Sequence, residues 1–241
     1  HMKKFFDYFD ERYRQSVLSG SASEDGPVIT VSRQTGCDAR ETAAGIVEKL
    51  NSIHKTTKWK WVDKDIIYSI AKELNIDTQR VESYYTGIKL SNLSEMIMAF
   101  SGGFVSDLRV KKAIKDVVLS ICKEGYVVLV GRGGVSISQG IRDSFHVRLV
   151  APFDWRMENV MRKKEMDKET AQKYIIETDL KREELIRTFL NKKQRNIDNL
   201  FDVTINRKSF PVDEISGFVA SMYERKMAVQ KAERDKIKSV L

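Results

Sequence analysis

VITVSRQTGCDARETAAGIVEKL, residues 28–50, is the stretch that decides the fold of this chain. Residues 28–32 are predicted to form a buried strand, a turn follows around Gly36, and residues 40–50 have the apolar spacing of a helix. A phosphate-binding loop has this layout, with glycines that let backbone amides converge on phosphate and a lysine that reaches the terminal phosphates. The turn lacks that lysine and most of those glycines. It is therefore a working nucleotide site, a degraded one or an ordinary strand-to-helix turn.

The composition of the 241 residues favours one α/β domain, with 41% hydrophobic and 32% charged residues. No apolar run approaches the length of about 20 residues that a membrane span needs. Cys37 and Cys122 form neither a disulfide framework nor a metal-ligand spacing, so we expect a cytoplasmic protein. The formal net charge of +8 favours an anionic partner. Nucleotides fit that charge, whereas nucleic acid is unlikely because no basic run is interleaved with aromatics.

The order of predicted elements indicates two parts. Residues 1–26 are predicted to be a helix and linker, and residues 27–241 a single domain with a helical insertion at about 75–105. Further strands are predicted at residues 59–62, 126–131, 145–151 and 200–206, with one long helical stretch over residues 153–191. Strands separated by helices imply a parallel sheet with helices on both faces. The sequence does not indicate an oligomeric state.

Polar residues follow three of these strands, where ligands bind in an open parallel sheet. Arg33 and Gln34 follow the first strand, Asp63 the second, and Gly131 and Arg132 the third. A guanidinium pairs with phosphate through two parallel hydrogen bonds, so two such arginines favour a phosphate ligand. The alternative is that each arginine pairs with a nearby carboxylate.

Together these segments resemble a known family. ITVSRQTG, VDKDIIY, VVLVGRGG, HVRLVAP, DLKREELIR and FDVTIN occur in the order found in the cytidylate-kinase-like family, a branch of the P-loop nucleoside monophosphate kinases. The similarity extends over about residues 28–216. It implies a three-layer P-loop kinase fold with a helical substrate-binding insertion and a lid at about residues 165–195. It also implies ATP with Mg²⁺ as the donor, without a dedicated protein metal site, and a nucleoside monophosphate as the acceptor.

The resemblance also implies a loop for the ATP phosphates. Its residues would be Arg33, Gln34, Thr35, Gly36, Cys37, Asp38, Ala39, Arg40 and Glu41. With Gly36 as the inner glycine, Asp38 falls at the last glycine, Ala39 at the lysine and Arg40 at the Ser/Thr position. The family typically reads S-R-Q-x-G-S-G-G-R-E, so this chain departs from it at residues 37–39. We expect the loop to be weak, with the Asp38 carboxylate opposing phosphate, and Arg40 to replace the lysine in part.

For the acceptor, the resemblance implies one further set of residues. These are Asp63, Tyr68, Gly131, Arg132, Arg156, Lys181 and Arg182. Catalytic charge stabilisation would come from Arg40, Arg182 and Arg187, because phosphoryl transfer mainly requires alignment and neutralisation of the equatorial oxygens. Alternatively, the segment around Asp179 is a solvated helix with salt bridges between its turns.

The sequence thus leaves three hypotheses. The favoured one is a kinase-like protein that phosphorylates a pyrimidine nucleoside monophosphate such as CMP or dCMP. The second is a non-catalytic relative that binds nucleotide or phosphate and regulates a partner, which the changes at Asp38 and Ala39 favour. A basic nucleic-acid-binding protein is the third and rests on net charge alone.

Overall fold

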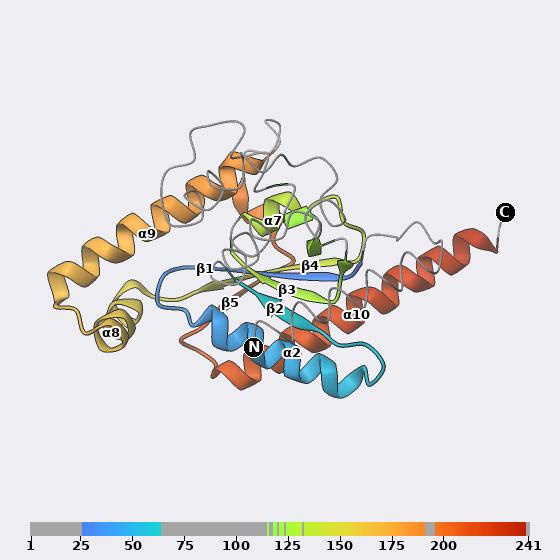
Figure 1. Cartoon of the computed structure of the whole chain (residues 1–241), viewed down its shortest axis with the longest axis horizontal. Coiled ribbons are helices and arrows are strands. Elements are labelled where there is room, and N and C mark those ends of the chain that lie inside the picture. The colour runs from blue at the N-terminus through green and yellow to red at the C-terminus, as the bar shows by residue number, and fades with distance from the viewer. Residues whose placement is uncertain are drawn as a thin grey trace, which may run out of the picture.

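A five-stranded parallel sheet lies at the centre of the protein, in the order β2-β3-β1-β4-β5 (Figure 1). The computed structural model describes residues 26–63, 115, 118–119, 121–122, 124–131, 133–190 and 196–239. The strands are β1 Val28–Arg33, β2 Lys60–Val62, β3 Val127–Val130, β4 Ser144–Val150 and β5 Val203–Asn206. The predicted N-terminal helix and the insertion at about 75–105 lie outside the described residues.

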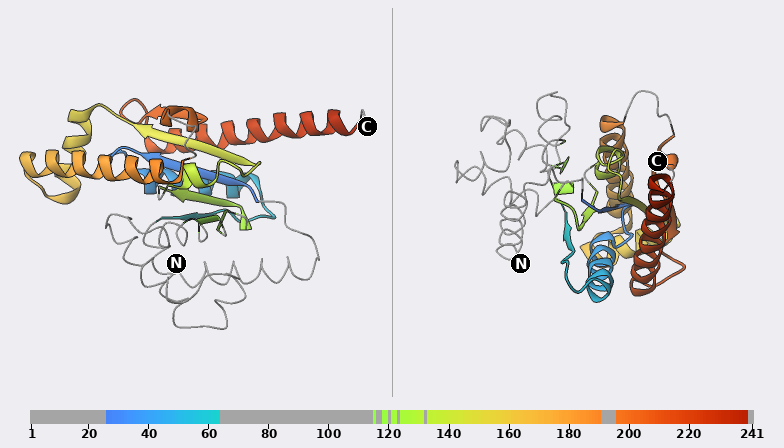
Figure 2. Two further views of the ribbon diagram at one scale, coloured as in Figure 1. Left: turned by 90° about the horizontal axis from the view of Figure 1, so that it is seen from above. Right: turned by 90° about the vertical axis from the view of Figure 1, so that its right-hand side faces the viewer.

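Helices cover both faces of the sheet. They are α2 Ala39–Ile53, α7 Gly134–Ile137, α8 Phe153–Lys164, α9 Lys168–Phe189 and α10 Val212–Lys238. The helices α2 and α10 pack together on one face, and α7 lies on the other beside the C-terminal part of α9 (Figures 1 and 2). This arrangement confirms the predicted α/β class and the layered kinase fold. None of the described helices is both long enough and apolar enough to cross a membrane.

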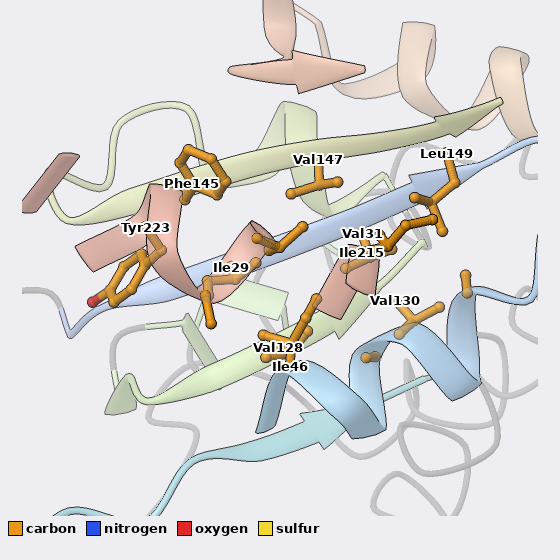
Figure 3. Close-up of a cluster of buried hydrophobic side chains, with 14 of the residues drawn as sticks. Ile29, Val31, Ile46, Val128, Val130, Phe145, Val147, Leu149, Ile215 and Tyr223 are labelled. Carbon is orange, nitrogen blue, oxygen red and sulfur yellow. The ribbon is translucent and has the colours of Figure 1, made fainter. Parts of the chain in front are cut away.

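The core lies between the sheet and the pair α2 and α10 (Figure 3). Register places Ile29 of β1 beside Val128 of β3 and Phe145 of β4, so that all three side chains point to the same face. Ile46 of α2 and Ile215 of α10 close this layer, and both are fully buried. Alternation along strands explains the pattern, since every second residue faces the same side.

The long helical stretch predicted over residues 153–191 was wrong in one respect. Glu165 has a left-handed backbone, with φ 53°, and it ends α8 there. Asp167 then caps α9 by accepting hydrogen bonds from the backbone N and the Oγ1 of Thr170, at 3.0 and 2.6 Å. A capping carboxylate satisfies a backbone donor that the first turn of a helix leaves unpaired, so a new helix begins. The result is a bent pair of helices beyond the carboxyl ends of the strands (Figure 1).

Strand β5 is also shorter than predicted. Residues 200–206 were expected to be extended, but Ile197–Leu200 form a turn of 3-10 helix and the strand begins at Val203. The side chain of Asn196 caps that turn by accepting from the backbone N of Asp198 at 2.9 Å.

Candidate phosphate-binding site

The loop between β1 and α2, where the sequence predicts a phosphate-binding turn, passes through two residues with positive φ. Gly36 has φ +95°, and Asp38 is left-handed, with φ 49° and ψ 44°, immediately before α2 begins at Ala39. Only glycine adopts the first conformation readily, and aspartate is one of the few other residues that tolerate the second. A Cβ at Gly36 would stand 2.8 Å from the carbonyl oxygen of Arg156, so the loop lies tightly against α8.

Thr35 already holds an anionic oxygen. Its backbone N and its Oγ1 both donate to Oδ1 of Asp179 on α9, at 2.7 and 2.6 Å. Such charge-assisted hydrogen bonds are about twice as strong as neutral ones. The loop therefore presents an amide and a hydroxyl to an anion, and α9 supplies that anion.

Arg156 of α8 joins three elements at this point. Its Nη1 donates to the carbonyl oxygen of Thr35 at 3.2 Å and to Oδ2 of Asp179 at 2.7 Å, and its Nε donates to the carbonyl oxygen of Ala151 at 3.1 Å. The side chain is buried and lies over the ring of Phe153. These contacts join Arg156 to the loop and to α9, and its predicted contact with the acceptor stays a prediction.

Arg182, one turn beyond Asp179 on α9, completes the cluster. Its Nη1 donates to Oγ1 of Thr35 at 2.8 Å and lies 3.6 Å from Oδ1 of Asp179. Burial lowers the pKa of this guanidinium, which Asp179 only partly offsets. Two arginines therefore share one carboxylate, and the cluster carries one excess positive charge.

The carboxylate of Asp38 does not stand alone in the loop. Its Oδ1 lies 2.5 Å from Nζ of Lys163 on α8, and its Oδ2 lies 3.4 Å from Nη2 of Arg207, which follows β5. Lys163 also contacts Oε1 of Glu41 at 3.0 Å, and Arg207 lies over the ring of Trp155. Although burial opposes it, the two carboxylates raise the pKa of Lys163. Lys163 and Arg207 thus offset the charge of Asp38, and the expectation that Asp38 weakens phosphate binding stays a prediction.

Arg40 forms an ion pair with Asp63, between Nε and Oδ2. The carboxylate is buried, and the pair joins the first turn of α2 to the end of β2. Arg40 was predicted to replace the lysine and Asp63 to bind the acceptor. The structure brings the two together, so a ligand would meet them as a pair.

At the ends of β1 and β3, Arg33 lies against Gly131. A Cβ on Gly131 would stand 2.2 Å from Nη1 of Arg33, and Gly131 has φ +73°. The positive φ is what favours glycine here, since the guanidinium of Arg33 could move aside for a Cβ. Gln34 anchors the loop to β4, since its Oε1 accepts from the backbone N of Ala151 at 3.1 Å. Arg132 and Tyr68, both predicted to bind the acceptor, lie outside the described residues.

Two predicted lid cations have no described contact with the loop. Arg187 pairs with Glu183 within α9 at 2.7 Å, and Lys181 is exposed. The structure thus brings Arg182 to the loop and leaves Arg187 on the solvent side of its helix.

Three residues that the sequence reasoning missed contact the loop. Asn159 donates through Nδ2 to the carbonyl oxygen of Gly36 at 3.2 Å, and Lys163 and Arg207 bind Asp38. Arg156, Asn159 and Lys163 are three and four residues apart, which places them on one face of α8. This spacing could have predicted that Asn159 and Lys163 face the same part of the protein as Arg156. Arg207 follows the carboxyl end of β5, so the rule that selected Arg33 also selects it.

Cys37 is buried within the loop. Burial raises the pKa of its thiol to about 12, although Arg156 opposes this. A thiol of this kind stays protonated near neutral pH and is a poor nucleophile. Cys37 therefore packs within the loop as a protonated, buried thiol.

This chain is similar in sequence and in fold to known proteins. The model of the cytidylate kinase-like family matches residues 28–209. The chain belongs to this family. It is 22% identical over 196 residues to the cytidylate kinase of Methanocaldococcus jannaschii, covering 80% of this chain and 96% of that protein. A solved structure of an uncharacterised protein from Eubacterium ventriosum shares the fold, with a TM-score of 0.55 and 16% identity over 83% of this chain and 98% of the other.

Proposed function

We propose that this protein transfers the γ-phosphate of ATP to a pyrimidine nucleoside monophosphate such as CMP or dCMP. The observation that carries this proposal is the pair of hydrogen bonds from Thr35 to an anionic oxygen, made by the loop in which Gly36 and Asp38 both have positive φ. The similarity to a cytidylate kinase supports the choice of acceptor.

In this proposal the donor phosphates lie on the loop at Thr35 and Gly36. Arg182 and Arg156 neutralise charge that develops on the moving phosphoryl group, which is the main task of a protein in phosphoryl transfer. Arg132, which the sequence places after β3, holds the acceptor phosphate. No side chain needs to act as a nucleophile, and the reaction takes place in the cytoplasm.

Magnesium would arrive with the nucleotide and screen charge between its phosphates. A Walker loop has a hydroxyl that contacts magnesium at the start of its helix. At that position of α2 this chain has Arg40, whose guanidinium is a cation and is paired with Asp63. Among the described residues, no group of three or more His, Cys, Asp or Glu side chains could hold a metal ion. In this proposal phosphate oxygens and water supply most of the ligands of the ion.

The alternative is a non-catalytic regulatory relative. It is favoured by the network of Asp38, Lys163, Arg207 and Glu41, which fixes the loop at the last glycine position of a Walker sequence, next to Ala39 at the lysine position. Retention of Arg156 and Arg182 at Thr35 favours the enzyme.

A coupled turnover assay with ATP, magnesium and each of CMP, dCMP, UMP, AMP and GMP tests the proposal. We expect ADP release with CMP or dCMP, and we expect Arg132→Ala to weaken monophosphate binding by about 1.5–3 kcal/mol, the range for a charged hydrogen bond. Arg132→Lys should keep only part of the lost binding free energy, because an ammonium cannot make the two parallel hydrogen bonds of a guanidinium. Calorimetric binding of ATP without turnover on any acceptor would support the regulatory alternative instead.

A further inference from the structure

The contact between Asp179 and Thr35 has the form of an anion bound to a phosphate loop. An amide and a hydroxyl donate to a single oxygen, at 2.7 and 2.6 Å, just after a strand and before a helix. A Walker loop offers backbone amides of this kind to phosphate, and a hydroxyl can donate to a phosphate oxygen in the same way. The oxygen belongs to the same chain, on α9, so no ligand is needed to fill the position.

The position that Asp179 fills carries an excess of positive charge, which favours an anion with more charge than a carboxylate. Arg156 and Arg182 both contact Asp179, at 2.7 and 3.6 Å, and one carboxylate cannot neutralise both. A phosphate carries more charge and more acceptor oxygens than a carboxylate, so both guanidiniums and Thr35 can bind it together. Exchange of the carboxylate for a phosphate is therefore electrostatically favoured.

We propose that Asp179 is an internal substitute for a donor phosphate, and that a polyphosphate must displace it from Thr35 in order to bind. This inference rests on the proposed function, because it assigns a regulatory device to the same loop. Asp179 would hold the loop in shape while it is empty and lower the apparent affinity for any competing anion. It would also couple loop occupancy to α9, which carries it.

The rest of α9 is anchored independently of Asp179. The Oγ of Ser136 on α7 donates to the carbonyl oxygen of Ile186 at 2.8 Å, and the ring of Phe189 fills the space that a Cβ on Gly133 would need, 2.7 Å away. Displacement of Asp179 should therefore loosen the middle turns of α9 while its C-terminal turns stay attached to α7.

The test is Asp179→Asn, which keeps the size of the side chain and removes its charge, with inorganic pyrophosphate as the probe. If the contact is closed in about nine molecules of ten, its loss should tighten apparent binding about tenfold by calorimetry. Glu177→Gln is the matched control, because Glu177 is exposed on the same helix two residues away and its loss changes the charge equally. We expect the control to bind pyrophosphate as the parent does.

Hydrogen exchange on the unsubstituted protein gives a second measurement if the variant does not fold. Pyrophosphate should speed exchange around Asp179 and leave residues 186–189 unchanged. Equal or weaker pyrophosphate binding by Asp179→Asn, or unchanged exchange around Asp179, would overturn the inference.

The turnover assay separates this result from the proposed function. Tighter pyrophosphate binding without phosphorylation of any monophosphate would leave the exchange at Thr35 standing and refute the kinase. Phosphorylation of CMP, without tighter binding of pyrophosphate by the Asp179→Asn variant, would support the kinase and refute the exchange at Thr35. Failure of parent and variant alike to bind pyrophosphate would overturn the exchange at Thr35, and the turnover assay would still decide the kinase.

Discussion

Replacement of Asp38 should change stability and nucleotide affinity in opposite directions. The carboxylate binds Lys163 and Arg207, and its side chain is 10% exposed, compared with 40% for Lys163 and 14% for Arg207. The half-exposed pair with Lys163 should contribute about 0.5–1 kcal/mol to the free energy of unfolding, and the buried pair with Arg207 about 1.5 kcal/mol. Asp38→Asn keeps the tolerance for a left-handed backbone and should therefore cost about 2 kcal/mol.

Asp38→Gly should cost only about 1 kcal/mol, because glycine relieves a left-handed backbone that disfavours other residues by about 1 kcal/mol. Both variants change the charge of the four-residue cluster of Asp38, Glu41, Lys163 and Arg207 from zero to +1. A unit charge about 8 Å from a phosphate charge is worth about 2 kcal/mol at an effective dielectric of about 20. With screening by salt, we expect ATP binding to tighten about tenfold.

Urea denaturation and calorimetric titration with ATP measure the two effects. Glu158→Gln, an exposed carboxylate on α8, is the control for charge alone. The reasoning about the ion pairs is refuted if both Asp38 variants are as stable as the parent. If they are less stable but bind ATP no more tightly than the control does, the cluster does not face the nucleotide.

Three further expectations concern the loop and the sheet. Arg156→Lys keeps the charge but cannot make all three contacts, so urea denaturation should show a loss of about 2–3 kcal/mol, whereas exposed Arg162→Lys should lose almost nothing. Burial lowers the pKa of His146 to about 4. Between that pKa and the ordinary pKa of histidine, the unfolded chain binds a proton that the folded protein does not, so the free energy of unfolding should fall by about 2 kcal/mol from pH 7 to pH 5. That slope should disappear in His146→Phe; if it persists, another group causes it. Iodoacetamide at pH 8 should label Cys37 roughly a thousandfold more slowly in the folded than in the unfolded protein, as followed by peptide mass spectrometry; rapid labelling of the native thiol would contradict its burial.

Much of the fold could be predicted because it depends on local pattern. The strand at Val28–Arg33 and the apolar face of α2 are visible as periodicity, and the order of the segments indicated the family. The break at Glu165 could not be found by the same route, because neither glycine nor proline marks it. The residue that marks this break in the sequence is Asp167, which caps α9. A search for apolar periodicity does not detect capping residues.

The site was harder to predict, because its contacts join distant parts of the chain. Sequence reasoning selected Asp38 and Arg182 by position but could not say that Asp38 would meet two cations or that Arg182 and Asp179 would both meet Thr35. The partners of Asp38 lie 125 and 169 residues away, and Thr35 and Asp179 are 144 residues apart. Pairing over such separations is decided by the register of the sheet and the angle between α8 and α9, neither of which leaves a trace in a local window.

Those separations also determine when the loop acquires its shape during folding. Residues 34–38 leave the ribosome early, yet Arg156, Asp179 and Arg207, which hold them, follow more than 100 residues later. Contacts between such distant positions form late, because a long stretch of chain must first be closed. Until the last strand is in place, a nascent chain carries the loop sequence without the scaffold that gives it an anion site. The loop is therefore assembled by completion of the domain, and nucleotide could assist folding only in its final step.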